Sequence, residues 1–133
     1  MAEGRSLVGA WRLVSYEARS ADGVEVFPFG VGATGMIIWD TDGSFSAQIS
    51  PGRAAGDTEP NYIAYFGRWE LEEGGGAVLH HVAGSVTETL RGTSQRRGLT
   101  FDGDRVTLTP PAREGAVAMS LVWERVRSAG VGS

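Results

Sequence analysis

The chain has 133 residues, a net charge of −4 and no cysteine, and all twelve of its basic residues are arginine. This length predicts one domain with a real core, and the missing residue types exclude disulfides, thiolate chemistry and lysine Schiff bases. The arginines are scattered along the chain, so nucleic acid is not an expected partner. The sequence has neither a signal-peptide pattern nor a run long enough to span a membrane, so we expect a cytoplasmic protein without membrane contact.

Three parts are expected along the chain. Residues 1–6 are polar and predict a disordered N-terminus, and residues 128–133 are small and predict a flexible tail. Residues 7–127 form the single folded domain.

The first strand is expected over residues 7–18, where apolar and polar side chains alternate. Trp11, Leu13 and Ser15 then share one face. Glu17 joins that face if the strand runs straight, but a bulge would move it to the other face.

Two less regular segments lie in the chain before and after the second hairpin. Residues 24–27 predict a short strand that ends at Pro28, and a weak helix signal begins at Asp57 or Thr58 and reaches Ala64. No other helix is expected.

The second hairpin is predicted over residues 36–40 and 44–50, around the turn Thr41-Asp42-Gly43. Because side chains alternate along strands, this loop sets the register and puts five apolar residues on one face. They are Ile37, Trp39, Phe45, Ala47 and Ile49.

The central hairpin is predicted over residues 65–85, with an acidic glycine-rich loop, and it contains the only two histidines. Pairing Glu72 with Ala77 places Trp69 opposite His80. The more apolar face, which we expect to be buried, then carries Tyr65, Trp69, Leu71, Val78, His80 and Val82. The opposite face carries Phe66, Arg68, Glu70, Leu79, His81 and Ala83. A slip of one residue would reverse this assignment.

A third hairpin is predicted over residues 95–101 and 105–109, and the last strand over residues 116–126. Leu99, Phe101, Val106 and Leu108 set the buried face of this hairpin, and Gln95 and Arg97 fall in line with it. Eight to ten short strands joined by glycine-rich turns predict an all-β fold. Because hairpins follow one another, we expect an antiparallel up-and-down barrel, with at most one short helix and room for one small ligand.

Two short motifs carry a family resemblance. Gly9-Ala10-Trp11 on the first strand and Trp123-Glu124-Arg125 on the last resemble the lipocalin signature. Further matching pieces are residues 12–15, 42–48, 64–70, 80–85 and 121–122. Over residues 7–126 the chain therefore resembles the bacterial lipocalin-like domain family. The resemblance implies a closed calycin-type barrel with a central pocket, and an arginine packed across the first-strand indole that reaches backbone carbonyls and closes one end.

His80 is the strongest candidate for chemistry because its near-neutral pKa suits proton transfer. The alternative is a buried structural histidine bonded to the backbone or to Tyr65. His81 should face outward near Arg68. Since adjacent residues of a strand point to opposite faces, the two histidines cannot readily share a metal, and no metal site or cofactor is expected.

Arg97 and Tyr65 complete the candidate catalytic set with His80, because Arg97 could hold a carboxylate or enolate oxygen and Tyr65 could donate to a ligand carbonyl. The alternatives are an arginine at the rim or paired with Glu88, and a tyrosine bonded to the backbone. The candidate ligand-binding residues are Trp39, Phe45, Trp69, Gln95, Trp123 and Ser15. Plain core packing is the alternative for the tryptophans and the better interpretation for Trp123. No His-Asp pair is placed to activate Ser15 as a nucleophile.

Two functions stay open from the sequence. The first is binding of a small hydrophobic metabolite in a mostly apolar pocket. The second, which the family resemblance implies for some members, is a cofactor-free cyclase or isomerase of a bacterial natural-product pathway of polyketide or terpene type. In that case His80 would move a proton. Phe66 and Leu79 on the outward face of the central hairpin are a candidate contact for a homodimer.

Overall fold

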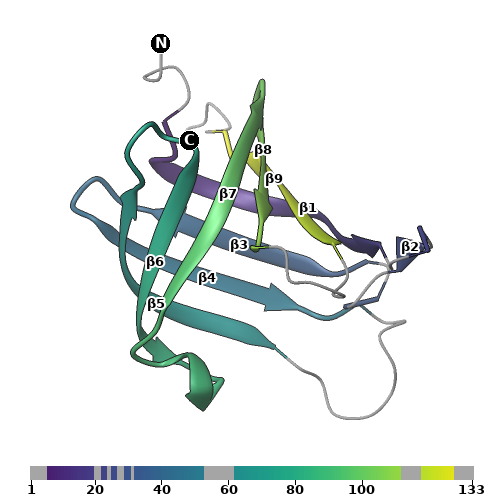
Figure 1. Ribbon diagram of the computed structural model, residues 1–133, viewed down its shortest axis with the longest axis horizontal. Helices are drawn as coiled ribbons and strands as arrows, with labels where there is room; N and C mark the ends of the chain where they lie inside the picture. Colours follow the sequence, from purple (N-terminus) through teal and green to yellow (C-terminus); the bar gives the residue numbers. More distant parts are fainter. Residues whose placement is uncertain are drawn as a thin grey trace.

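The protein is described by a computed structural model in which strands follow one another around an antiparallel barrel (Figure 1). The described residues are 6–19, 22–23, 25–26, 29–30, 32–52, 62–111 and 118–127. The strands are β1 (Gly9–Arg19), β2 (Glu25–Val26), β3 (Thr34–Trp39), β4 (Ser44–Ser50), β5 (Ile63–Leu71), β6 (Ala77–Ser85), β7 (Ser94–Asp102), β8 (Arg105–Thr109) and β9 (Ala118–Arg125). The expected N-terminal and C-terminal tails lie almost wholly outside the described residues.

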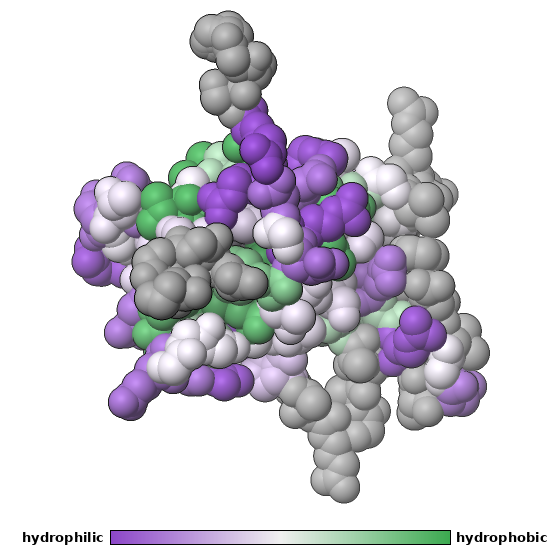
Figure 2. Space-filling model, turned by 90° about the horizontal axis from the view of Figure 1, so that it is seen from above, coloured by the Kyte–Doolittle hydropathy of each residue, from purple (hydrophilic) through white to green (hydrophobic). Residues whose placement is uncertain are grey.

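The barrel is closed because β1 pairs with β9 as well as with β3. Eight strands, β1 and β3 to β9, form the closed wall, and the two-residue strand β2 pairs with the end of β1. Each strand pairs antiparallel with its neighbour, so the expected all-β up-and-down barrel is confirmed. Hydrophilic residues cover much of the face seen from above, with hydrophobic residues between them (Figure 2).

Helical structure within the described residues consists of one 3₁₀ turn, η3 (Glu88–Leu90). The helix expected from Asp57 or Thr58 falls mostly on residues outside the described ones, but Ala64 belongs to β5, so the helix does not reach it. Among the helices of the described part of the chain, none is long and apolar enough to cross a membrane.

The hairpin of β3 and β4 has the predicted register, with Trp39 opposite Phe45 and Ile37 opposite Ala47. The five residues predicted to share a face are at most 4% exposed, so this prediction is confirmed. Alternation along the strands placed them on the inner face.

The hairpin of β5 and β6 also has the predicted register, because Trp69 lies opposite His80 and Leu71 opposite Val78. His80 and Val78 are fully buried, as the prediction of the inner face requires. Leu71 is the exception, since it is 47% exposed at the end of the hairpin and not buried as expected. The pairing shifts by one residue between Phe66 and Gly67.

A bulge in β1 changes which side chains point into the barrel. Leu13 pairs with Trp123, but Ser15 pairs with Val122 and Tyr16 with Leu121, so Val14 is an extra residue. After such a bulge the alternation restarts one residue later. Tyr16 therefore joins the inner face with Leu121, and the expectation that Ser15 shares the face of Trp11 is wrong.

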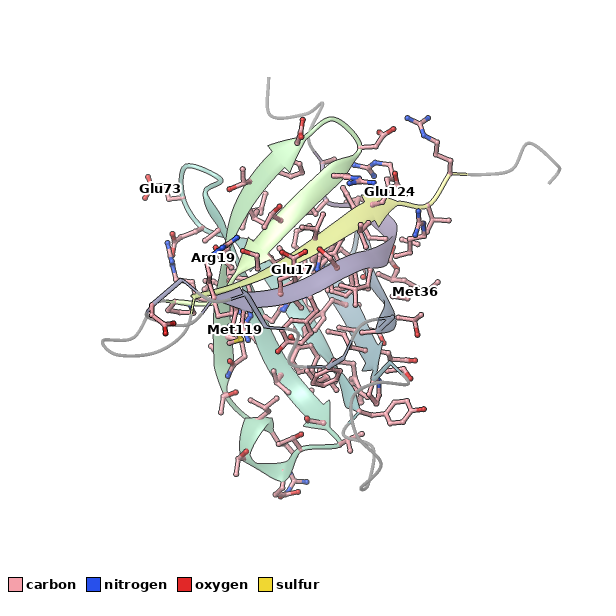
Figure 3. The ribbon with its side chains drawn as sticks, turned by 90° about the vertical axis from the view of Figure 1, so that its right-hand side faces the viewer. Glu17, Arg19, Met36, Glu73, Met119 and Glu124 are labelled. Carbon is pink, nitrogen blue, oxygen red and sulfur yellow. The ribbon has the colours of Figure 1, made fainter. Side chains whose placement is uncertain are left out.

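The same shift decides the position of Glu17. Its partner on β9 is Ser120, whereas its neighbour Ala18 is buried and pairs with Met119. Glu17 lies on the outer side of β1, as Glu124 lies on the outer side of β9 (Figure 3). Glu17 is therefore not an interior carboxylate.

One end of the barrel is closed by Trp11 and Arg125. The Arg125 guanidinium lies 4.3 Å from the centre of the Trp11 ring, and its nitrogens donate to the backbone oxygens of Val8 (3.0 Å) and Ser6 (2.6 Å). The Trp11 indole donates to the backbone oxygen of Leu7 at 2.9 Å. The arginine implied by the family resemblance thus makes the expected contacts.

Candidate functional site

A cavity of about 570 Å³ lies inside the barrel, toward the end opposite Arg125. Its wall is mostly apolar, with a few polar side chains from β1, β5 and β7. The residues that line it are Tyr16, Ile37, Ala47, Ile49, Ile63, Tyr65, Leu90, Ser94, Gln95, Arg96, Arg97, Leu108, Pro110, Pro111, Met119, Leu121 and Trp123. Four of the nine predicted site residues, Tyr65, Arg97, Gln95 and Trp123, are brought together here.

Arg97 is the cation on the inner side of this wall. It pairs across the sheet with Val78, which is fully buried, and cross-strand neighbours point to the same side. Its guanidinium donates to the backbone oxygen of Arg96 at 2.9 Å and to Gln95 Oε1 at 3.3 Å. The alternative that Arg97 pairs with Glu88 is not what the structure shows, since Glu88 pairs with Arg91.

Two tyrosines line the cavity with Arg97. Burial raises the pKa of Tyr65 and that of Tyr16 above the ordinary value, while the positive charge of Arg97 lowers both pKa values by a smaller amount. Both phenols therefore stay protonated at neutral pH and can donate a hydrogen bond. Within the described residues no group hydrogen-bonds to the Tyr65 hydroxyl, and that of Tyr16 has only a 3.8 Å contact with Met119 Sδ.

Gln95 and Trp123 supply two more polar groups. Gln95 donates to Thr93 Oγ1 at 2.8 Å and accepts from Arg97, so the structure uses it to hold the arginine. Trp123 is 1% exposed, and its Nε1 has no partner among the described residues. Its ring is part of the core as well as of the cavity wall.

His80 is buried in the core and is not one of the cavity-lining residues. Its ring stacks on Phe45, with centroids 4.2 Å apart, and its Nε2 accepts a 2.9 Å hydrogen bond from the Trp39 indole. Since Nε2 accepts, the neutral ring carries its proton on Nδ1, which has no partner in the described structure. The Tyr65 ring lies edge-on to His80, but Trp39 is its hydrogen-bond partner.

The electrostatics of His80 oppose a role in proton transfer at neutral pH. Burial, with smaller contributions from the positive charges of Arg97 and His81, lowers the pKa of His80 to about 3. A general acid or base works best with a pKa near the working pH and needs a path to the substrate. The geometry instead matches the structural alternative, with Trp39 as the partner.

The remaining candidates lie away from the cavity. Trp39 is fully buried and Phe45 is 4% exposed, so both pack in the core. Trp69 is half-buried and donates to the backbone oxygen of Asp40 at 2.9 Å. Ser15 lies on the outer face with Val122. None of these four lines the cavity.

Tyr16, which the bulge in β1 turns inward, is not among the site residues predicted from the sequence. The charged residues of the strand nevertheless indicate that Tyr16 turns inward. Arg12 is at an even position, whereas Glu17 and Arg19 are at odd positions, so solvent-facing charges change phase between residues 12 and 17. A bulge is the ordinary cause of such a phase change.

His81, the other histidine, is half-buried on the outer side. Its ring nitrogens contact Glu70 Oε2 at 2.7 Å and Ser94 Oγ at 2.8 Å. Within the described part of the chain, no group of three or more histidine, aspartate or glutamate side chains is placed to hold a metal ion.

A comparison with protein families agrees with this architecture. A model of the lipocalin-like domain family matches residues 8–60 and 54–126, which is most of the chain. One solved structure with a similar course of the chain is a de novo designed fluorescence-activating β-barrel. It is 15% identical, the match covers 95% of this chain and 99% of that one, and the TM-score is 0.49. No curated protein is significantly similar in sequence. The chain belongs to the lipocalin-like domain family.

Proposed function

We propose that this barrel binds a small, mostly apolar molecule in its central cavity. The observation that carries the proposal is the cavity itself, whose volume of about 570 Å³ lies within the range of small-molecule sites. Its wall combines branched apolar side chains such as Ile49 and Leu121 with a few polar groups, which is the composition typical of such sites. From the sequence alone, we expect the protein to bind this molecule in the cytoplasm.

The position of His80 favours binding over the cyclase or isomerase alternative. That alternative relied on His80 to move a proton inside the barrel. The histidine is neutral, bonded to Trp39 and absent from the cavity wall. Its geometry therefore removes the proton-transfer group on which the enzymatic alternative relied.

A cavity-filling variant tests the proposal. N-phenyl-1-naphthylamine, a neutral apolar dye, should bind saturably to the wild type with one site and gain fluorescence. Ile63→Trp adds volume inside the cavity and should weaken binding by at least about tenfold, equivalent to about 1.4 kcal/mol.

The matched control is Ala64→Trp, on the neighbouring position of the same strand. Ala64 pairs with the exposed Gln48 and so points outward, and this variant should bind the dye like the wild type. Thermal unfolding of both variants confirms that they fold. Absence of saturable binding in the wild type, or equal loss in both variants, contradicts the proposal.

A further inference from the structure

In the described part of the chain, the barrel wall is incomplete beside the first half of β7. Strand β6 pairs with β7 over residues 94–98, but β8 pairs only with residues 98–102 (Figure 1). Pro110 follows β8 and has no N–H with which to extend the ladder. Within the described residues, the stretch from Ser94 to Arg97 therefore has a strand on one side only.

Exposed residues line the cavity at this break. Arg96 lines it from one side and Pro111 from the other, and both are exposed. Leu90 of η3 and Met119 of β9 lie along the same part of the wall. The opening thus lies between β7 and the Pro110-Pro111 segment, and we call it the β7 opening.

A cation that has no carboxylate partner among the described residues lies at the β7 opening. The ion pairs among the described residues are Arg12–Glu124, His81–Glu70, Arg91–Glu88, Arg96–Glu72, Arg105–Glu124 and Arg127–Asp104. Arg97 belongs to none of them, although it is partly buried. Its two acceptors, the Arg96 backbone oxygen and Gln95 Oε1, are both neutral. A guanidinium has five N–H donors, so donors are left over for a ligand.

The surroundings of Arg97 offer further hydrogen-bond donors to an oxyanion. The phenols of Tyr16 and Tyr65 share the cavity with it and are both within reach of its electrostatic field. In the described part of the wall, Arg96 is the other cation, and its guanidinium is already held bidentately by Glu72 on the outer side. Partial burial of a cation costs less free energy when an anion compensates its charge. Arginine recognises carboxylates especially well, because its guanidinium can bind both carboxylate oxygens.

We propose that the ligand is an amphiphilic monocarboxylate, whose carboxylate binds Arg97 at the β7 opening while its apolar body fills the cavity. Tyr65 and Tyr16 are the additional hydrogen-bond donors to the same carboxylate. This inference depends on the proposed small-molecule binding, because it names the class of ligand for that same cavity.

The test compares decanoate with 1-decanol as competitors of the neutral dye. The two have the same chain length but only decanoate is charged at pH 7.5. The wild type should prefer decanoate by at least about tenfold, since a hydrogen bond to a charged group contributes roughly 1.5–3 kcal/mol. Arg97→Gln should reduce this preference to near one, and Arg97→Lys should retain part of it.

Arg91→Gln is the matched control, because it removes a positive charge next to Leu90 from a guanidinium that Glu88 already holds and that does not line the cavity. It should keep the full preference for decanoate. Two outcomes would show that Arg97 does not select a carboxylate: the wild type binds the dye without preferring decanoate to 1-decanol, or this preference survives Arg97→Gln. Either outcome overturns this inference, while the binding proposal stands. If Arg97→Gln fails to fold, the wild-type preference and its reduction in Arg97→Lys decide the question. Lack of dye binding by the wild type overturns both.

Discussion

At the scale of single residues, His80 shows how burial can change what a functional-looking side chain does. An exposed histidine titrates near neutral pH and exchanges protons with water. Here the ring is stacked between aromatic neighbours, and its only hydrogen-bonded nitrogen accepts from Trp39. The same residue that looked like an acid-base group is a neutral packing element that links β3 to β6.

This placement predicts a specific acid sensitivity. The folded-state pKa of His80 is about 3, below the unfolded value of about 6.5, so between these values the unfolded state binds a proton that the folded state excludes. The contribution of the neutral ring to stability is complete above pH 6.5 and is lost as the pH falls toward 3. Lowering the pH from 7.5 to 5.0 should therefore reduce the free energy of unfolding by about 2 kcal/mol, measured by urea denaturation.

Two histidine variants isolate the effect. His80→Phe should be less stable at pH 7.5, because the Trp39 indole loses its acceptor, but its stability should depend less on pH over this range. His81→Gln, on the outer side, should keep the wild-type pH dependence. An unchanged pH dependence in His80→Phe would show that His80 is not the titrating group.

At the scale of elements, two bulges determine which side chains enter the barrel. The bulge in β1 turns Tyr16 inward and Ser15 outward, and the shift between β5 and β6 lies at Gly67, opposite Val82. At Gly67 the backbone of β6 comes so close that a Cβ would lie 2.0 Å from the His81 carbonyl oxygen. The glycine is therefore required by this close approach.

Replacing Gly67 should break the β5–β6 hairpin locally. Gly67→Ala forces the His81 carbonyl away and should lower the free energy of unfolding by at least about 2 kcal/mol, measured by urea denaturation. Gly76→Ala is the control in the turn of the same hairpin, where nothing lies within 4 Å of the added methyl group. A similar small effect in both variants would mean that β6 can yield without cost.

At the scale of the whole molecule, the barrel is filled at one end and hollow at the other. Trp11, Trp39, His80 and Phe45 form a chain of ring contacts with centroids 4.2 to 6.1 Å apart, which fills the end near Arg125. The opposite half is lined by smaller apolar residues and the polar set around Arg97. Large rings close one end, and the space left beyond them is the cavity.

Arg125 should be central to this closure because it joins β9 to the segment before β1. Arg125→Ala removes the contact with the Trp11 ring and two hydrogen bonds to backbone oxygens, and should lower the free energy of unfolding by about 2–3 kcal/mol. Arg127→Ala removes an arginine that is exposed and paired with Asp104, so it should change stability much less than Arg125→Ala does. Equal melting temperatures for the two variants would contradict a closing role for Arg125.

The sequence by itself determined the strand pairing to a large extent. The registers of Trp39 with Phe45 and of Trp69 with His80 follow from side-chain alternation and turn position, because a one-residue slip would expose a whole apolar face. The contact between the Gly-x-Trp motif and Arg125 was implied by the family resemblance that these motifs carry. Of the candidate site, Arg97, Gln95 and Tyr65 were placed on inner faces by the same alternation.

Only the tertiary structure decided which inner-facing residues meet empty space. His80 and Phe45 point inward as Arg97 does, yet the rings of neighbouring strands cover the first two and leave Arg97 at the β7 opening. The bulge that turns Tyr16 inward and the early end of β8 at Thr109 are also products of strand packing around the closed wall. Alternation assigns a side chain to a face, but how far that face is filled depends on side chains from other strands, which no single stretch of sequence contains.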